Sequence, residues 1–199
     1  AKKGFTKFDV FNIGVPEKIR ENVDLKSIRT PFIPFGEDNL FPQFLAEVKR
    51  QSPTHRAILG QKKILSMGKN FFSTNPAVEE FIKDVNQGES MREVYGRIID
   101  DYYSFGNAYM QIVKHEGGIN LFHIDATKCR ISKDQKHIYI HPDWAKYGSS
   151  KQDSVIVPVY PEFENNTSIL QFKDYEATFN YYGLPDFVAA LEWLSIDHQ

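Results

Sequence analysis

One stretch of the sequence, residues 90–125, constrains the fold more than any other. Ser90 followed by Glu93 is the pattern of a capping box, in which side chains and backbone amides at the start of a helix satisfy one another. Apolar side chains then recur at helical spacing, at Met91, Val94, Tyr95, Ile98, Ile99, Tyr102 and Tyr103. Gly106 predicts the end of this helix, because glycine readily adopts the left-handed conformation in which helices often end.

The same stretch continues as a β-hairpin. From Asn107 the period changes to two, with Ala108, Met110 and Ile112 on one face and Tyr109, Gln111 and Val113 on the other. Gly117-Gly118 predicts a tight turn, and residues 119–124 are expected to return as the second strand. A long helix that leads directly into a hairpin is therefore the unit on which the rest of the chain is expected to pack.

Three shorter helices are expected before this unit. The predicted ranges are residues 41–51 with Asn39 as the cap, residues 53–67 with Ser52 as the cap, and residues 76–85 with Asn75 as the cap. A proline stands in the first turn of each, where its missing N–H costs no hydrogen bond. The second helix has Ala57, Ile58, Ile64 and Leu65 as its apolar residues, and Arg56, Gln61, Lys62 and Lys63 as its polar ones.

Short strands dominate the chain after the hairpin. They are predicted at residues 129–132, 137–141, 154–160 and 168–172, with a surface loop at 146–153. Helical spacing returns over residues 185–199. The predicted fold class is α+β: N-terminal helices packed on a mostly antiparallel β-sheet, with a closing C-terminal helix.

The domain organisation follows from the same patterns. Residues 1–30 show little periodicity and are expected to form an arm, either a flexible one or one that docks on a neighbouring subunit. Residues 31–199 are expected to form the α+β domain. The chain begins without Met, and its final periodic stretch has no helix stop signal, so we expect a fragment of a longer chain.

Composition excludes several classes of protein. Lys and Arg number 24 against 26 Asp and Glu, so the chain lacks the basic excess of a stand-alone nucleic-acid-binding protein. A single cysteine, Cys129, can form neither an internal disulfide nor a thiolate metal cluster. No apolar run approaches the roughly 18 residues that cross a membrane, and no membrane partner is expected.

Three histidines provide the main alternative hypothesis. His137 and His141 are four residues apart on a predicted strand and face the same side, and His123 lies in a neighbouring predicted strand. With Arg130 they could line a sheet surface in a ligand-binding or metal-dependent enzyme domain. No carboxylate stands at ligand spacing to complete a metal site, so ordinary half-exposed histidines are the favoured interpretation.

Other chemistry-bearing residues favour structural roles. Asp100 and Asp101 point about 100° apart on a helix, which prevents them from sharing a substrate and favours a solvated helix edge. Cys129 is expected to be a buried strand residue. The cations of residues 52–69 could contact a phosphate backbone, although a polar helix face is favoured. We predict no enzyme activity, and no catalytic, cofactor-binding or metal-binding residues.

Three motifs, in their order and spacing, resemble one known family. They are the Ser-Pro helix start and terminal glycine within residues 41–68, the Gly-Asn-Ala element within 101–125 that leads toward Arg130, and the Tyr-Gly-x-Pro turn within 182–194. These stretches are similar to the N-terminal, wing part of the portal proteins of tailed bacteriophages. The resemblance covers about residues 31–199.

The resemblance implies a structural role. Portals are homo-oligomeric rings, usually dodecamers, at the capsid vertex through which DNA is packaged and ejected. Implied partners are further copies of the chain, capsid, terminase and tail-connector proteins, in a virion assembled in the host cytoplasm. The stem, clip and tunnel loop have no counterpart here, so little direct DNA contact by these residues is expected. Another phage or prophage structural adaptor is a third interpretation.

Overall fold

The computed structural model describes residues 30–148 and 154–194, so the predicted arm lies outside the described residues except for Thr30. The helices are α1 (Phe41–Gln51), α2 (Pro53–Met67), α3 (Pro76–Lys83), α4 (Met91–Phe105) and α5 (Leu191–Leu194). The strands are β1 (Asn107–His115), β2 (Gly118–Ile124), β3 (Cys129–Ile131), β4 (His137–Ile140), β5 (Val155–Pro158) and β6 (Thr167–Lys173). The 3₁₀-helices are η1 (Ala126–Lys128), η2 (Trp144–Lys146) and η3 (Asp186–Ala190). The α+β class is confirmed. No helix of the described ranges is long and apolar enough to cross a membrane.

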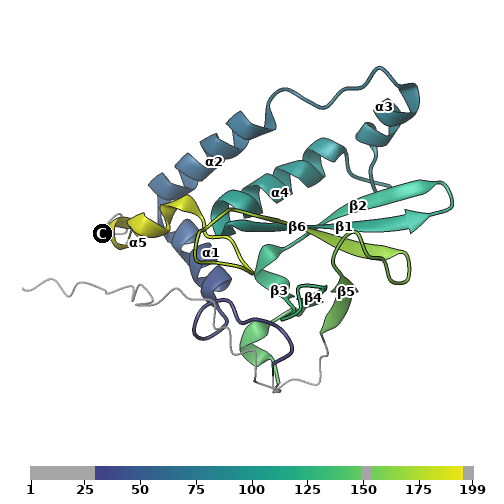
Figure 1. Ribbon diagram of the computed structural model, residues 1–199. Coiled ribbons are helices and arrows are strands. Elements are labelled where there is room, and N and C mark those ends of the chain that lie inside the picture. Colours follow the sequence, from purple (N-terminus) through teal and green to yellow (C-terminus); the bar gives the residue numbers. More distant parts are fainter. Residues whose placement is uncertain (1–29, 149–153, 195–199) are drawn as a thin grey trace, which may run out of the picture.

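The strands form two sheets (Figure 1). One has the order β2-β1-β6 and the other β3-β4-β5, and every pair of neighbouring strands within them is antiparallel. A parallel bridge between Val159 and Ile169 joins the segment after β5 to β6. The predicted sheet is thus divided in two, with the second sheet folded against the first.

The predicted helix–hairpin unit is confirmed. Ser90 and Glu93 form the capping box of α4, and Gly106 ends the helix with φ 67°. One face of β1 contributes Ala108 and Ile112 to an apolar cluster beneath α4. The opposite face contributes Tyr109 to a second, larger core. Strand β1 therefore separates the two cores.

The larger core joins the loop before α1 to the last described segment, which includes Tyr182 and Leu191. Phe35 stacks on Tyr182 with ring centroids 4.2 Å apart, and both side chains are buried. Leu45 of α1 and Ile138 of β4 lie in the same cluster. Burial of large aromatic side chains is among the strongest apolar contributions to a fold, so this cluster stabilises α1, the second sheet and the closing segment together.

The predicted cap of α1 is wrong. Leu40 occupies the N-cap position and makes no side-chain hydrogen bond there. Asn39 instead has φ 64°, and its Oδ1 accepts hydrogen bonds from Phe35 N (3.1 Å) and Arg130 Nε (2.6 Å). Asparagine tolerates the left-handed conformation, and here its amide is used for a tertiary contact.

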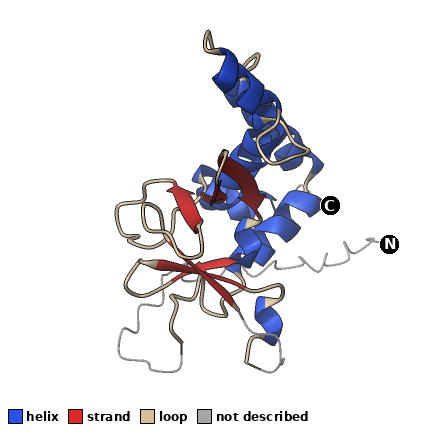
Figure 2. Cartoon of the chain, turned by 90° about the vertical axis from the view of Figure 1, so that its right-hand side faces the viewer, coloured by secondary structure: helices blue, strands red, loops and turns tan. Residues whose placement is uncertain are grey.

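None of the four apolar residues named for the second helix is buried in α2. The two buried residues of this helix are His55 and Leu59, whereas Ile58, Ile64 and Leu65 are exposed, Leu65 to 79%. Helix α2 lies over α4 as an outer layer, and Figure 2 shows the helices projecting away from the strands. Because α4 covers only one side of α2, the remaining apolar side chains face solvent.

Candidate functional site

The most tightly built place in the molecule is a contact between backbones, which we call the glycine junction and which consists of Gly106, Asn107 and Gly183. The Asn107 side chain is buried at 2% exposure. Its Nδ2 donates to the carbonyl oxygens of Phe105 and Gly183, and its Oδ1 accepts from Gly183 N, each at 2.9 Å. One carboxamide thus joins segments 76 residues apart in the chain.

Only glycine fits at both backbone positions of the junction. A Cβ on Gly106 would lie 2.4 Å from the Leu184 carbonyl carbon. A Cβ on Gly183 would lie 2.3 Å from Gly106 O and 2.5 Å from Asp174 N. Asp174 N in turn donates to Gly106 O (2.8 Å). The ends of α4 and β6 and the 182–185 turn therefore meet with no space for a side chain between them.

Arg130 is fully buried, and its guanidinium hydrogen-bonds to separate segments of the chain. Its hydrogen-bond acceptors are Asn39 Oδ1 (2.6 Å), Asn39 O (2.6 Å), Cys129 O (2.7 Å), Thr127 O (3.2 Å) and Gln43 Oε1 (3.4 Å). Burial lowers the pKa of the guanidinium from its ordinary value. These contacts hold the loop before α1 and α1 itself on β3, and they leave the guanidinium unavailable to a ligand.

The three histidines of the alternative hypothesis are not brought together. His123 belongs to β2 of the first sheet, whereas His137 belongs to β4 of the second and His141 follows it. His141 is buried, accepts from Asp143 N through Nδ1 (3.1 Å) and packs on Trp144. In the described part of the chain no three His, Cys, Asp or Glu side chains are grouped to hold a metal ion.

Asp101 departs from the prediction of a solvated edge. It is buried, and its Oδ2 lies 2.7 Å from His123 Nε2 and 3.0 Å from Ala126 N, which donates to it. Burial raises the pKa of Asp101, while the hydrogen bond to His123 opposes that rise. Asp100 points away to Lys49 at 2.9 Å, so the predicted divergence of the two carboxylates is confirmed.

Cys129 is buried, as predicted. Burial raises the pKa of its thiol well above the ordinary value. A thiol that stays protonated at neutral pH is a poor nucleophile, so Cys129 belongs to the core rather than to a reactive site.

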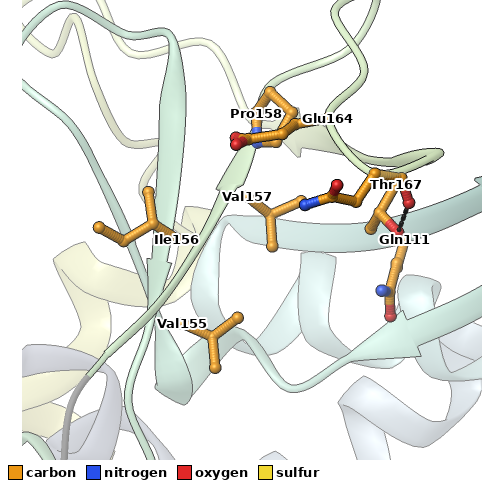
Figure 3. A pocket seen from close by; sticks show the side chains of 8 residues that line it. Gln111, Val155, Ile156, Val157, Pro158, Glu164 and Thr167 are labelled. Atoms are coloured by element: carbon orange, nitrogen blue, oxygen red, sulfur yellow. Dashed lines mark hydrogen bonds between the residues drawn. The ribbon is translucent and has the colours of Figure 1, made fainter.

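A shallow hollow of about 280 Å³ opens beside strand β5 (Figure 3). Its lining consists of Gln111, Val155, Ile156, Val157, Pro158, Glu164, Asn165 and Thr167. Val155 and Val157 give it an apolar side, and among the described residues Glu164 is the one ionisable side chain that lines it. A general acid and a base therefore do not converge in the described part of this hollow.

The sequence did not predict that the residues of the glycine junction contact one another. The sequence identified Gly106 and the 183–185 turn as separate chain breaks. The unusual signal was an asparagine directly after a helix-ending glycine, at the first position of a strand, where Asn is disfavoured. That signal marks Asn107 as a residue retained for its hydrogen bonds.

No protein-family model matches the sequence, and no curated protein is significantly similar to it. Its fold is similar to parts of chains in solved structures of gene transfer agent (GTA) particles. For the neck of the empty GTA particle, computed with C6 symmetry, the TM-score is 0.62 at 13% identity, over 80% of this chain and 44% of that chain.

Two further GTA structures agree. The virion of the native particle gives a TM-score of 0.61 at 15% identity, over 77% of this chain and 42% of that one. The neck of the native particle, computed with C12 symmetry, gives 0.59 at 13% identity, over 79% and 42%. The chain thus spans less than half the length of the chains it matches, and at these identities the likeness shows a shared fold.

Proposed function

We propose that this chain is a structural component of the head–tail connector region of a tailed phage or phage-like particle, and that it is part of the portal ring there. The observation that carries the proposal is the fold shared with GTA neck and virion chains over about four-fifths of this chain. The three ordered stretches that resemble the wing part of portal proteins add to it independently, because they are a property of the sequence alone.

The internal geometry supports a structural role rather than an enzymatic one. The buried polar side chains Asn107, Arg130 and Asp101 each fasten one chain segment to another. Catalysis requires a nucleophile, acid or base that can reach a substrate in a pocket. Among the described residues the hollow beside β5 has one ionisable side chain, and burial raises the pKa of the Cys129 thiol.

We further propose that copies of the chain form a closed homo-oligomeric ring of twelve. Structures with a shared fold were computed with C6 and C12 symmetry, which supports a ring of this kind. In this proposal capsid, terminase and tail-connector proteins are its partners, within a virion assembled in the host cytoplasm. DNA passes through the ring with little direct contact by these residues, consistent with a net charge of −2.

The proposal can be tested on particles from the source cells. An antibody raised against residues 30–194, applied to purified particles, is expected to place gold label at the junction of head and tail. Label over the capsid shell or the tail tip, or particles that lack peptides of this chain, would overturn it. Deletion of the gene separates the finer alternatives, because loss of a portal should leave heads without DNA, whereas loss of another adaptor should leave filled heads without tails.

A further inference from the structure

Two apolar patches are exposed on the described surface. The helix patch consists of Ile58, Ile64 and Leu65 of α2, and the strand patch is the exposed edge of β5 at Val155 and Ile156, whose side chains lie on opposite faces of the strand, with Val155 on the side of the hollow. Each of these side chains is at least half exposed. From their chemistry and position we infer that the helix patch of one copy binds the strand patch of the next copy. The inference rests on the proposed ring and names the surfaces that would form it.

The helix patch has no covering element in the described structure. Ile58 and Leu65 are seven residues apart and therefore share one face of α2. That face is turned away from the side on which Leu59 packs. Exposed apolar side chains gathered on one element mark an interaction surface more often than scattered ones do. The sequence of α2 thus provides apolar side chains that no element within residues 30–148 and 154–194 covers.

The strand patch offers a complementary shape. Strand β5 lies at the edge of its sheet, with β4 on one side. The hollow of about 280 Å³ opens where Val155 and Val157 face Gln111 and Thr167 (Figure 3). An aliphatic side chain such as that of Leu65 has the chemistry to fill it, since apolar anchors inserted into pockets contribute most of the affinity of protein interfaces.

The two patches lie in stretches of the sequence with opposite charge. Residues 48–78 contain no Asp or Glu, and their cations are Lys49, Arg50, Arg56, Lys62, Lys63 and Lys69. Residues 152–172 contain no Lys or Arg, and their acids are Asp153, Glu162 and Glu164. A basic apolar surface and an acidic apolar surface attract each other and disfavour self-pairing of either one.

Several charged side chains of these two stretches are free of ion pairs with other described residues. Lys49, Arg50 and Lys62 already pair within the chain, with Asp100, Glu47 and Asp186. Within residues 30–148 and 154–194 no ion pair engages Arg56, Lys63 and Lys69, or Glu162 and Glu164. The side chains of Arg56, Lys69, Glu162 and Glu164 are exposed. They can therefore form the polar rim of an interface.

The position of the patches specifies the symmetry of the contact. Helix α2 and strand β5 lie on opposite sides of the molecule (Figure 1). Two unlike surfaces on opposite sides produce a head-to-tail contact, which can close into a ring, whereas a two-fold dimer needs one self-complementary surface. A second copy of this chain is the occupant that satisfies shape, charge and symmetry together.

Cysteine cross-linking tests the contact directly. Cys129 is buried with a raised thiol pKa, so introduced cysteines are the reactive ones. Leu65→Cys mixed with Val155→Cys, treated with a short bismaleimide at high protein concentration, is expected to give a cross-linked dimer. The double variant is expected to give a ladder of higher species, and each single variant alone no cross-link. Tyr175→Cys, which is 87% exposed and on neither patch, replaces Val155→Cys in the control.

A charge reversal supplies a second readout. Arg56→Glu is expected to lower the cross-link yield about fivefold, as reversal of a rim charge weakens association by up to about 1 kcal/mol. Glu164→Lys on the other partner is expected to restore it. Leu65–Leu65 dimers, or a yield no higher than that of the Tyr175→Cys control, would overturn the inference. So would a complex of the unmodified chain with duplex DNA that is lost in Arg56→Glu while no cross-link forms.

These outcomes separate the contact from the proposed function. Gold label at the head–tail junction without the Leu65–Val155 cross-link means that the ring forms through other surfaces, and the inference fails alone. The cross-link ladder with label elsewhere on the particle means that the proposed function fails while the contact between copies remains.

Discussion

The glycine junction and helix α2 represent two extremes of packing within one fold. At the junction, backbones approach so closely that a single Cβ on Gly183 would lie 2.3 Å from a carbonyl oxygen. In α2, two of fifteen residues are buried, and Gly60 has no atom within 4 Å of the place of a Cβ. The backbones of this fold are thus packed far more closely where α4, β6 and the 182–185 turn meet than along α2.

The two regions also differ in what their residues are selected for. At Gly106 and Gly183 the close approach of backbones leaves no room for a side chain, whereas Asn107 is constrained by the hydrogen bonds of its carboxamide. On α2 the apolar side chains of Ile58, Ile64 and Leu65 are exposed and take no part in the packing of the described residues. A rigid centre with a sparsely packed outer helix is the arrangement expected of a subunit that presents a surface to a neighbour.

The largest expected effect is at the junction. Gly106→Val combines a φ of +67°, which a β-branched residue adopts only with strain, and a Cβ placed 2.4 Å from the Leu184 backbone. We expect it to lower the free energy of unfolding by about 4 kcal/mol or more, measured by urea denaturation.

The control for Gly106→Val is a substitution at a glycine of helix α2. Gly60→Ala introduces the first carbon of a side chain into open space within α2, and alanine favours a helix over glycine. We expect it to raise the free energy of unfolding by about 0.5–1 kcal/mol. Equal losses in Gly106→Val and Gly60→Ala would show that the junction is not the more constrained region.

The second effect concerns the buried guanidinium. Arg130→Met keeps much of the side-chain volume. It removes the N–H donors whose hydrogen bonds the carbonyl oxygens of Asn39, Thr127 and Cys129 accept. Leaving buried acceptors unsatisfied is expected to cost about 3 kcal/mol of unfolding free energy, measured by urea denaturation.

Arg56→Met, on the exposed surface of α2, is the matched control. It removes a charge that no described residue pairs with, and we expect a change within about 0.5 kcal/mol. A comparable loss in both variants would contradict the structural role given to Arg130.

Two leucines of α2 differ strongly in burial within this single helix. Leu59 is 2% exposed and Leu65 is 79% exposed. Leu59→Ala is expected to cost about 2 kcal/mol, because it leaves a cavity between α2 and α4. Leu65→Ala is expected to change the free energy of unfolding by less than about 0.5 kcal/mol. Thermal unfolding of both variants measures the difference, and equal losses would place Leu65 inside the core.

Local signals predicted the local structure well. The capping box, the glycine stop and the change of period at Asn107 predicted α4, β1 and β2, because each signal acts within a few residues. The sequence could not predict that α2 exposes Ile58 and Leu65. Helical spacing indicates which residues share a face, but the covering element is set by tertiary packing.

The tertiary roles of polar residues were the least predictable. Asn39 has the residue type of a helix cap, yet Arg130, 91 positions away in the chain, competes for its amide. Asp101 is a charged residue of the kind expected on a solvated helix edge, yet it is buried against His123 and the backbone N–H of Ala126. Such contacts depend on pairings across the fold, which a single sequence does not reveal.

The smallest expected effect is the pH dependence contributed by Asp101, which lies between the two regions on the α4 face toward β2. Its pKa is raised by burial, so the folded state holds its proton more tightly than the unfolded chain, whose Asp pKa is about 3.9. Its contribution to stability is therefore complete below about pH 3.9 and decreases as the pH rises through the folded-state pKa. Asp101→Asn cannot titrate, so its stability relative to the wild type should increase as the pH rises through that window.

Glu93→Gln provides a control of opposite sign, because hydrogen bonds from Ser90 lower the pKa of Glu93 and its contribution is lost as the pH falls. Urea denaturation of the three proteins at a series of acidic pH values measures both effects. The difference between wild type and Asp101→Asn should shrink or reverse with rising pH, whereas that between wild type and Glu93→Gln should grow. Parallel curves for wild type and Asp101→Asn would mean that the carboxylate of Asp101 is solvated in the folded protein. That result would remove the buried anion from the contact between α4 and β2, and this contact would then be held by apolar packing alone.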